Sequence, residues 1–106
     1  MKKGEIYLVR FPFTDLSASK LRPALVLINF KQDLSVCFIT TQLSLMEESD
    51  MLVSPDFNTG INQNSLIKVG KIATISKNLV FGKLGSLSEA QINLLNQKLK
   101  QVFQIP

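Results

Sequence analysis

Histidine and tryptophan are absent from the 106-residue chain, and cysteine occurs once, at Cys37. Without histidine, one chain cannot build a Ser-His or Cys-His nucleophile pair, nor a zinc site made from Cys and His ligands. A single cysteine also excludes a disulfide within the monomer. The chemistry expected of this sequence therefore uses neither a histidine base nor a Cys/His metal centre.

Long apolar runs are missing too. The longest uninterrupted one, residues 24–28, is far below the ~18 residues that a membrane span requires. The basic N-terminus resembles the start of a signal peptide, but Arg10 interrupts the apolar stretch behind it and no small-residue cleavage site follows. We therefore expect a cytoplasmic protein. Its length predicts a single domain over residues 1–106, and a hydrophobic content of 45% predicts a folded globule.

The chain carries an excess of basic residues over acidic ones. Twelve basic residues against eight acidic ones give a net charge of +4, which favours a polyanionic partner such as nucleic acid. That excess alone is weak evidence, because many small proteins carry it without binding nucleic acid. The lysines at positions 68, 71, 77 and 83 could add a basic surface, but their dispersion favours a solubilising role on strands and turns.

Most of the chain has the composition and alternation of β-strands. Alternation places Tyr7 and Val9 on one face of the first strand and Ile6 on the other. Residues 14–21 are mostly small or polar and predict a mobile loop. The predicted strands cover residues 5–11, 24–28, 35–42, 51–54, 65–69, 71–76 and 79–84.

The last segment changes to a helical period. Ser88 and Gln91 have the spacing of a capping box, and apolar residues then recur at intervals of three and four. This pattern predicts an amphipathic helix over residues 89–103. About five to seven short strands and one terminal helix indicate a mainly β fold, a small, SH3-like curved sheet or partly open barrel with the helix packed against it.

Two short segments could carry chemistry. Arg22 stands just before Pro23, at the junction of the predicted loop with a buried strand, where its guanidinium would present a planar fork matched to phosphate oxygens. From this placement alone, a surface arginine in a salt bridge is the favoured explanation. Residues 40–42, Thr-Thr-Gln, bring two hydroxyls and an amide to the end of a strand. Threonine is a common strand residue, so β-propensity alone would explain them.

Taken together, these segments resemble the MazF/PemK-like toxin family. The Arg-Pro step at 22–23 and the Ile-Thr-Thr-Gln at 39–42 are the most specific elements of the resemblance. It extends over nearly the whole chain, in order and at family-like spacing, through residues 5–15, 20–27, 39–42, 64–68, 71–77 and 84–88.

This resemblance implies a sequence-selective endoribonuclease that acts without the ribosome, as the toxin of a type II toxin–antitoxin pair. It implies a homodimer with single-stranded RNA in a groove across the interface. A cognate antitoxin would occupy the same groove through a disordered segment that folds on binding. Cleavage would use the RNA 2′-hydroxyl and leave 2′,3′-cyclic phosphate and 5′-hydroxyl ends, with no metal or other cofactor.

By the same resemblance, Arg22 matches the family's catalytic arginine and Thr40 its catalytic hydroxyl residue. For RNA binding we expect Ser19 and Lys20 near backbone phosphates, and Thr41 and Gln42 near a base edge. Simpler explanations exist for two of these residues. Lys20 could only solvate the loop, and Thr41, facing away from Thr40, could point into the core.

The chain departs from the family pattern in one place. Many members carry a Glu in the loop before the Arg-Pro step, whereas residues 17–21 here contain no carboxylate. Asp15 is the only acidic residue nearby. The sequence therefore leaves the general base and the cleavage specificity open.

Two other functions fit the sequence. A catalytically inactive relative would keep the fold and the groove and bind RNA, DNA or an antitoxin, since a scaffold does not fix activity. Retention of both Arg22 and Thr40 favours the enzyme. A generic SH3-like interaction barrel is less favoured, because tryptophan is absent and tyrosine occurs once.

Overall fold

The computed structural model describes residues 1–12 and 19–106, with side chains for residues 1–10 and 20–106. Six strands form one antiparallel sheet in the order β4-β5-β3-β2-β1-β6. The elements are β1 (Glu5–Pro12), β2 (Ser19–Asn29), β3 (Asp33–Thr40), η1 (Leu43–Leu45), β4 (Met51–Val53), β5 (Ser65–Ser76), η2 (Lys77–Leu79), β6 (Val80–Ser86) and α1 (Glu89–Val102). The expected mainly β fold with a C-terminal helix is confirmed.

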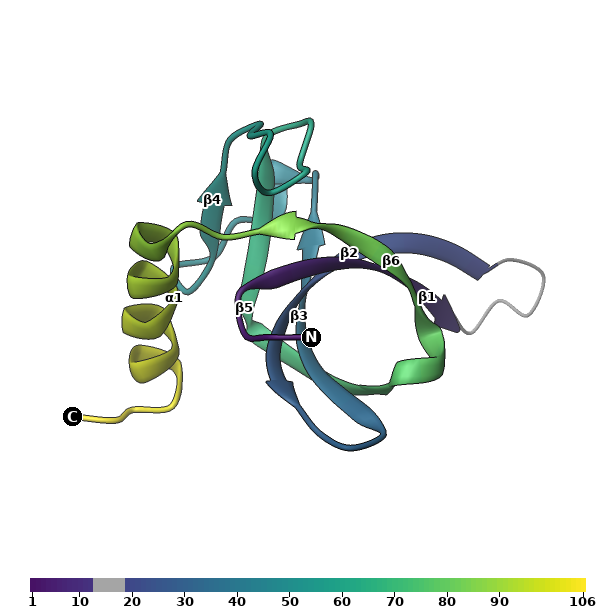
Figure 1. Ribbon diagram of the computed structural model, residues 1–106. Helices are drawn as coiled ribbons and strands as arrows, with labels where there is room; N and C mark the ends of the chain where they lie inside the picture. Colours follow the sequence, from purple (N-terminus) through teal and green to yellow (C-terminus); the bar gives the residue numbers. More distant parts are fainter. Residues whose placement is uncertain (13–18) are drawn as a thin grey trace.

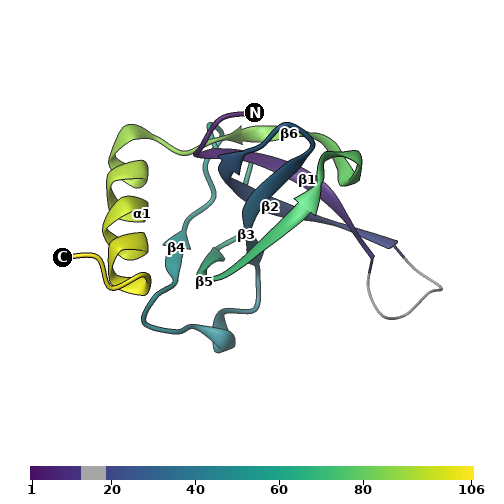
Figure 2. The same ribbon diagram turned by 90° about the horizontal axis from the view of Figure 1, so that it is seen from below.

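The sheet curves strongly, and α1 lies at the side of β4 and β5 (Figures 1 and 2). The end of β1 and the start of β2 project on the side away from the helix in both views. Among the described residues, no helix has the length and apolarity needed to cross a membrane.

The predicted bounds of two strands, β2 and β5, were wrong. Strand β2 begins at Ser19 rather than at residue 24, and it pairs with β1 from Ser19 opposite Pro12 onward. Pro23 is tolerated inside the strand because pairing with β3 begins only at Ala24, so Pro23 has a ladder on one side alone. Residues 19–21 thus belong to a hairpin rather than to the predicted loop.

The strands predicted at 65–69 and 71–76 are one continuous strand, β5. Gly70 stands at the point where β5 leaves its pairing with β4 and the end of β3, and the β3–β5 register shifts there, between Cys37 and Ile39. A glycine inside a strand marks such a bend (Figure 1). The remaining boundaries differ from prediction by only a few residues, since β3 ends at Thr40 and α1 at Val102.

The two faces of the sheet carry separate apolar clusters. The larger cluster contains Ile6, Cys37 and Ile39 and is covered by α1, which adds Leu95 to it and packs Ile92 against it. The smaller cluster, on the opposite face, consists of Val9, Ala24, Val26, Leu34 and Val36, with Tyr7, Phe38, Ile75, Leu79 and Val80 packed against it. By alternation along β2 and β3, Arg22 and Thr40 lie on the face of the smaller cluster.

Candidate functional site

Arg22 lies inside β2, three residues after its start and directly opposite Val9 of β1. Because side chains alternate along a strand, Arg22 shares the face of Ala24 and the smaller apolar cluster. Its side chain is half-buried. Pairing with β1 therefore fixes the backbone of Arg22, which does not lie at the edge of a loop. The guanidinium group extends from this fixed backbone position.

Thr40 is the last residue of β3 and is paired with Leu66 of β5. Its hydroxyl oxygen accepts a hydrogen bond of 3.1 Å from the backbone N–H of Gln42. A hydroxyl has one O–H to donate as well as lone pairs to accept. Since the Gln42 amide uses a lone pair, the O–H of Thr40 remains available to donate to a bound group.

The strand register brings Arg22 and Thr40 to matching positions. Strands β2 and β3 pair antiparallel with Ala24 opposite Phe38, and Arg22 and Thr40 each stand two residues beyond that pair. Alternation along each strand puts both side chains on the same face as that pair, just beyond the end of the β2–β3 ladder. A guanidinium fork and a hydroxyl donor thus lie on one face of the sheet, just beyond this end of the β2–β3 ladder.

The four residues predicted to bind RNA have different surroundings. Lys20 is exposed on β2, two residues before Arg22 and on the same face. Thr41 and Gln42 are both exposed, immediately after β3. Thr41 therefore does not point into the core, which removes the simpler explanation for it. Ser19 begins β2, but its side chain lies outside the described part of the chain, as does the whole of Asp15.

Sequence reasoning missed a buried ion-pair cluster on Lys68, which was expected to be a solubilising surface lysine. Its ammonium donates to Asp50 Oδ2 at 2.6 Å, to Leu45 O at 2.9 Å and to Glu47 Oε1 at 3.1 Å. The side chains of Lys68 and Asp50 are 7% and 1% exposed. A lysine inside the apolar run of residues 66–69 was the signal that could have found it.

The electrostatics of this cluster favour the charged lysine. Burial opposes the charge of Lys68, but hydrogen bonds from its ammonium to Asp50 and Glu47 outweigh that effect and raise the pKa of Lys68 above its ordinary value. All three donors of the ammonium have acceptors, which is the condition under which a buried lysine is tolerated.

Burial alone raises the pKa of the Cys37 thiol to about 12, so that this cysteine is a structural residue rather than a nucleophile.

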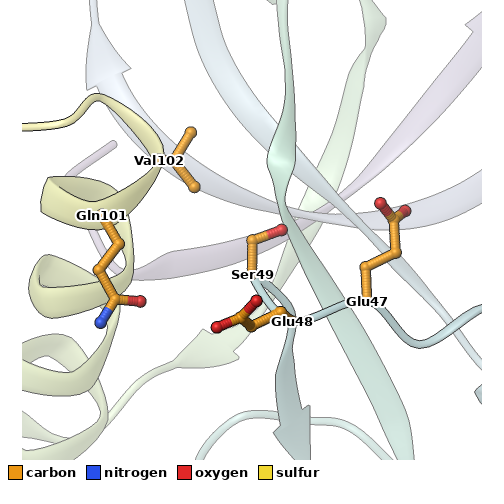
Figure 3. A pocket seen from close by; sticks show the side chains of 5 residues that line it. All are labelled: Glu47, Glu48, Ser49, Gln101 and Val102. Carbon is orange, nitrogen blue, oxygen red and sulfur yellow. The ribbon is translucent and has the colours of Figure 1, made fainter.

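A surface hollow of about 450 Å³ lies beside this cluster, between the end of α1 and the segment before β4 (Figure 3). It is lined by Glu47, Glu48, Ser49, Gln101 and Val102, and by none of the six predicted site residues. Figure 3 shows the Glu47 side chain pointing away from Gln101 and Val102. Its carboxylate therefore belongs to the Lys68 cluster more than to the hollow.

Sequence comparison identifies the family of this chain. A family model for a PemK-like, MazF-like toxin of a type II toxin–antitoxin system matches residues 2–103. The chain belongs to this family. Arg22 and Thr40, the two residues that carried the resemblance, each stand two residues beyond the Ala24–Phe38 pair of the β2–β3 ladder. No significantly similar sequence was found among curated proteins.

Solved structures with the same fold come from several bacteria. An endoribonuclease in complex with its cognate antitoxin, from a mycobacterial species, superposes with a TM-score of 0.76 at 17% identity, over 100% of this chain and 95% of that one. The Mycobacterium tuberculosis toxin MazF-mt6 gives 0.76 at 21% identity, over 96% and 98%. MazF from Deinococcus radiodurans gives 0.76 at 13% identity, over 99% and 97%. At these identities the likeness establishes the fold.

Proposed function

We propose that this PemK/MazF-like protein is a sequence-selective, metal-independent endoribonuclease, the toxin of a type II toxin–antitoxin pair that acts on single-stranded RNA in the cytoplasm. The observation that carries the proposal is the placement of Arg22 and Thr40 at matching positions of β2 and β3 on one face of the sheet. Family membership supports the reaction class.

The reaction needs no protein nucleophile. The 2′-oxygen of the RNA attacks the adjacent phosphorus and loses its proton, while the bond from phosphorus to the 5′-oxygen breaks and that oxygen takes up a proton. The products are a 2′,3′-cyclic phosphate and a 5′-hydroxyl. What the protein must supply is orientation, charge stabilisation at the crowded phosphorus and help with the two proton transfers.

Arg22 suits the charge-stabilising role. The guanidinium is charged at every working pH, and its fork can donate two parallel hydrogen bonds to the non-bridging oxygens. Negative charge on these oxygens is greatest at the transition state, so donors held in advance by the β1–β2 hairpin stabilise the transition state more than the bound RNA.

Thr40 would donate its O–H to the phosphate or to the leaving 5′-oxygen, because the bond from the Gln42 amide uses only a lone pair of the hydroxyl oxygen. Lys20 and Ser19 would contact backbone phosphates next to the cleaved bond, while Thr41 and Gln42 would contact the base edge that sets specificity.

A homodimer would provide the groove in which the RNA lies, and a cognate antitoxin would compete for that groove. Light scattering on the purified protein tests the first part, and a monomer at micromolar concentration would contradict it. The mycobacterial relative solved with its cognate antitoxin supports the second part.

The experiment is incubation of purified protein with a long single-stranded RNA in excess EDTA, beside Arg22→Ala and the exposed control Arg10→Ala. We expect discrete cuts ending in cyclic phosphate from the wild type and from Arg10→Ala, and none from Arg22→Ala at nearly unchanged Tm. Mapping of the cut ends would give the recognition sequence. Uncut RNA with a folded wild-type dimer would contradict the enzyme and favour an inactive RNA-, DNA- or antitoxin-binding relative.

A further inference from the structure

We propose that Lys68 is a positioning residue for Thr40, acting through the connection between β3 and β4 (residues 41–50). This inference rests on the proposed function only for its catalytic consequence, since the positioning itself can be measured without RNA. Lys68 lies on β5, on the same face of the sheet as Thr40, because Thr40 is paired with Leu66 and side chains alternate along the strand.

Three hydrogen bonds lead without a gap from the ammonium to the catalytic hydroxyl. Lys68 Nζ donates to Leu45 O at 2.9 Å, Leu45 N–H donates to Gln42 O at 3.1 Å, and Gln42 N–H donates to Thr40 Oγ1 at 3.1 Å. The middle bond closes the 3-10 turn η1 and so links Leu45 to Gln42. The position of the Gln42 amide, and with it the orientation of the Thr40 hydroxyl, is thereby tied to Lys68.

The other end of the lysine is fixed by charge. The β4–β5 register, with Met51 opposite Ile67, continues to Asp50 opposite Lys68, and their atoms meet at 2.6 Å. Asp50 Oδ2 also accepts the backbone N–H of Glu47 at 2.8 Å. One buried ion pair therefore holds the connection at residues 45, 47 and 50, just after the residues expected to contact RNA.

Such anchoring has a reason in this chain. Residues 41–46 are all exposed, and the large apolar ones among them, Leu43, Leu45 and Met46, are 40%, 52% and 54% exposed. Thr41 and Gln42 would otherwise move with the connection, and catalytic geometry tolerates little movement, since a shift of about 1 Å can cost about 10²-fold in rate. Burial of a charged pair costs more than an apolar contact would, but it fixes one geometry.

The test removes both buried charges together, because removal of Lys68 alone would leave Asp50 buried without a partner. In Asp50→Asn/Lys68→Met, the Asn oxygen can still accept the Glu47 amide while Leu45 O loses its donor. The matched control is Lys83→Met, which removes the same charge from an ion pair with Glu5 at the opposite edge of the sheet.

Two readouts separate this inference from the proposed function. Amide hydrogen exchange, followed by NMR, should show Gln42 and Leu45 exchanging at least about tenfold faster in the double variant, with amides of β1 and β2 unchanged. On RNA, kcat should fall about tenfold or more with KM little changed, while Lys83→Met behaves as wild type. Unchanged exchange, or equal protection loss in the control, would overturn the inference whether or not the protein cleaves RNA.

If the double variant does not fold, substitutions at Gln42, whose N–H donates to Thr40 Oγ1, give an independent test. Gln42 has φ of −82°, which proline can adopt, so Gln42→Pro removes the N–H that holds Thr40 Oγ1 at little backbone strain. Gln42→Ala loses the same side chain and keeps that N–H. We expect kcat for Gln42→Pro to lie about tenfold or more below that for Gln42→Ala, and equal values would overturn the inference.

Discussion

Lys83 Nζ lies 2.6 Å from Glu5 Oε2 and ties the edge strand β6 to β1. The same carboxylate accepts hydrogen bonds from the Lys2 backbone N–H at 2.6 Å and from the Tyr7 hydroxyl at 3.1 Å. The bond from Lys83, together with that from Lys2, lowers the pKa of Glu5 from 4.5 to about 2. A carboxylate with so low a pKa links the stability of the β1–β6 edge to pH.

The stability contributed by Glu5 should be lost in acid. A lowered folded-state pKa gives stabilisation that is complete above the unfolded value, near 4.5, and disappears as the pH falls toward 2. Wild type should therefore exceed Glu5→Gln in Tm at pH 6, with the difference shrinking between pH 4.5 and 2. Thermal melts across this range test it. In a Lys83→Met background the difference at pH 6 should be smaller, and an equal difference would show that Lys83 is not the cause.

Replacement of Thr40 should separate its hydroxyl from its shape. Thr40→Val keeps the volume and removes the O–H, and loss of one transition-state donor costs about 10²–10³ in kcat. Thr40→Ser restores the hydroxyl and should retain most of the activity. Single-turnover cleavage of a short RNA containing the mapped site measures both. Similar loss in the two variants would assign Thr40 a packing role instead.

Lys20 should contribute to RNA affinity through charge alone. A single-strand phosphate contact adds about 0.7 to the slope of log K against log salt, so Lys20→Ala should reduce that slope by about this amount and weaken all sequences alike. Fluorescence anisotropy with a 2′-O-methyl RNA, which cannot be cleaved, measures the slope. Lys100→Ala removes an equal charge from the exposed side of α1 and should leave the slope unchanged.

The cap of α1 should contribute measurably to stability. Ser88 accepts from the Gln91 amide at 3.2 Å, and the Gln91 side chain accepts from the Ser88 amide at 2.8 Å. Ser88→Ala should cost about 1 kcal/mol of unfolding free energy, and Ser88→Gly only a few tenths relative to Ser. Urea denaturation at pH 7 distinguishes them. If both variants unfold at the wild-type midpoint, the cap has no energetic role.

Local sequence patterns predicted the structural features that depend only on residues close together in the sequence. The capping box and the apolar period of α1 lie within the helix itself, and alternation was enough to put Tyr7 and Ile6 on opposite faces of β1, and Phe38 and Cys37 on opposite faces of β3. Arg22 and Thr40 were identified by family resemblance, and only the strand register shows that each stands two residues beyond the Ala24–Phe38 pair.

What the sequence did not reveal depends on contacts distant along the chain. Lys68 is buried by Asp50, Glu47 and Leu45, which are 18, 21 and 23 residues away. A lysine among apolar residues is compatible with either a solvated strand or a paired interior charge until those partners are placed. For the same reason Gly70 appeared to separate two strands, although it marks a bend where β5 changes its pairing.

Pairing of Glu5 with Ser86 means that the first strand is completed by the last. At a synthesis rate of about 5–20 residues per second, roughly 4–16 s pass between the synthesis of β1 and the completion of β6. Throughout that interval one side of β1 is an open edge with unsatisfied N–H and C=O groups, a template for pairing with another chain. A newly made molecule of this protein therefore passes through a stage in which it is most exposed to misassembly and has no finished sheet.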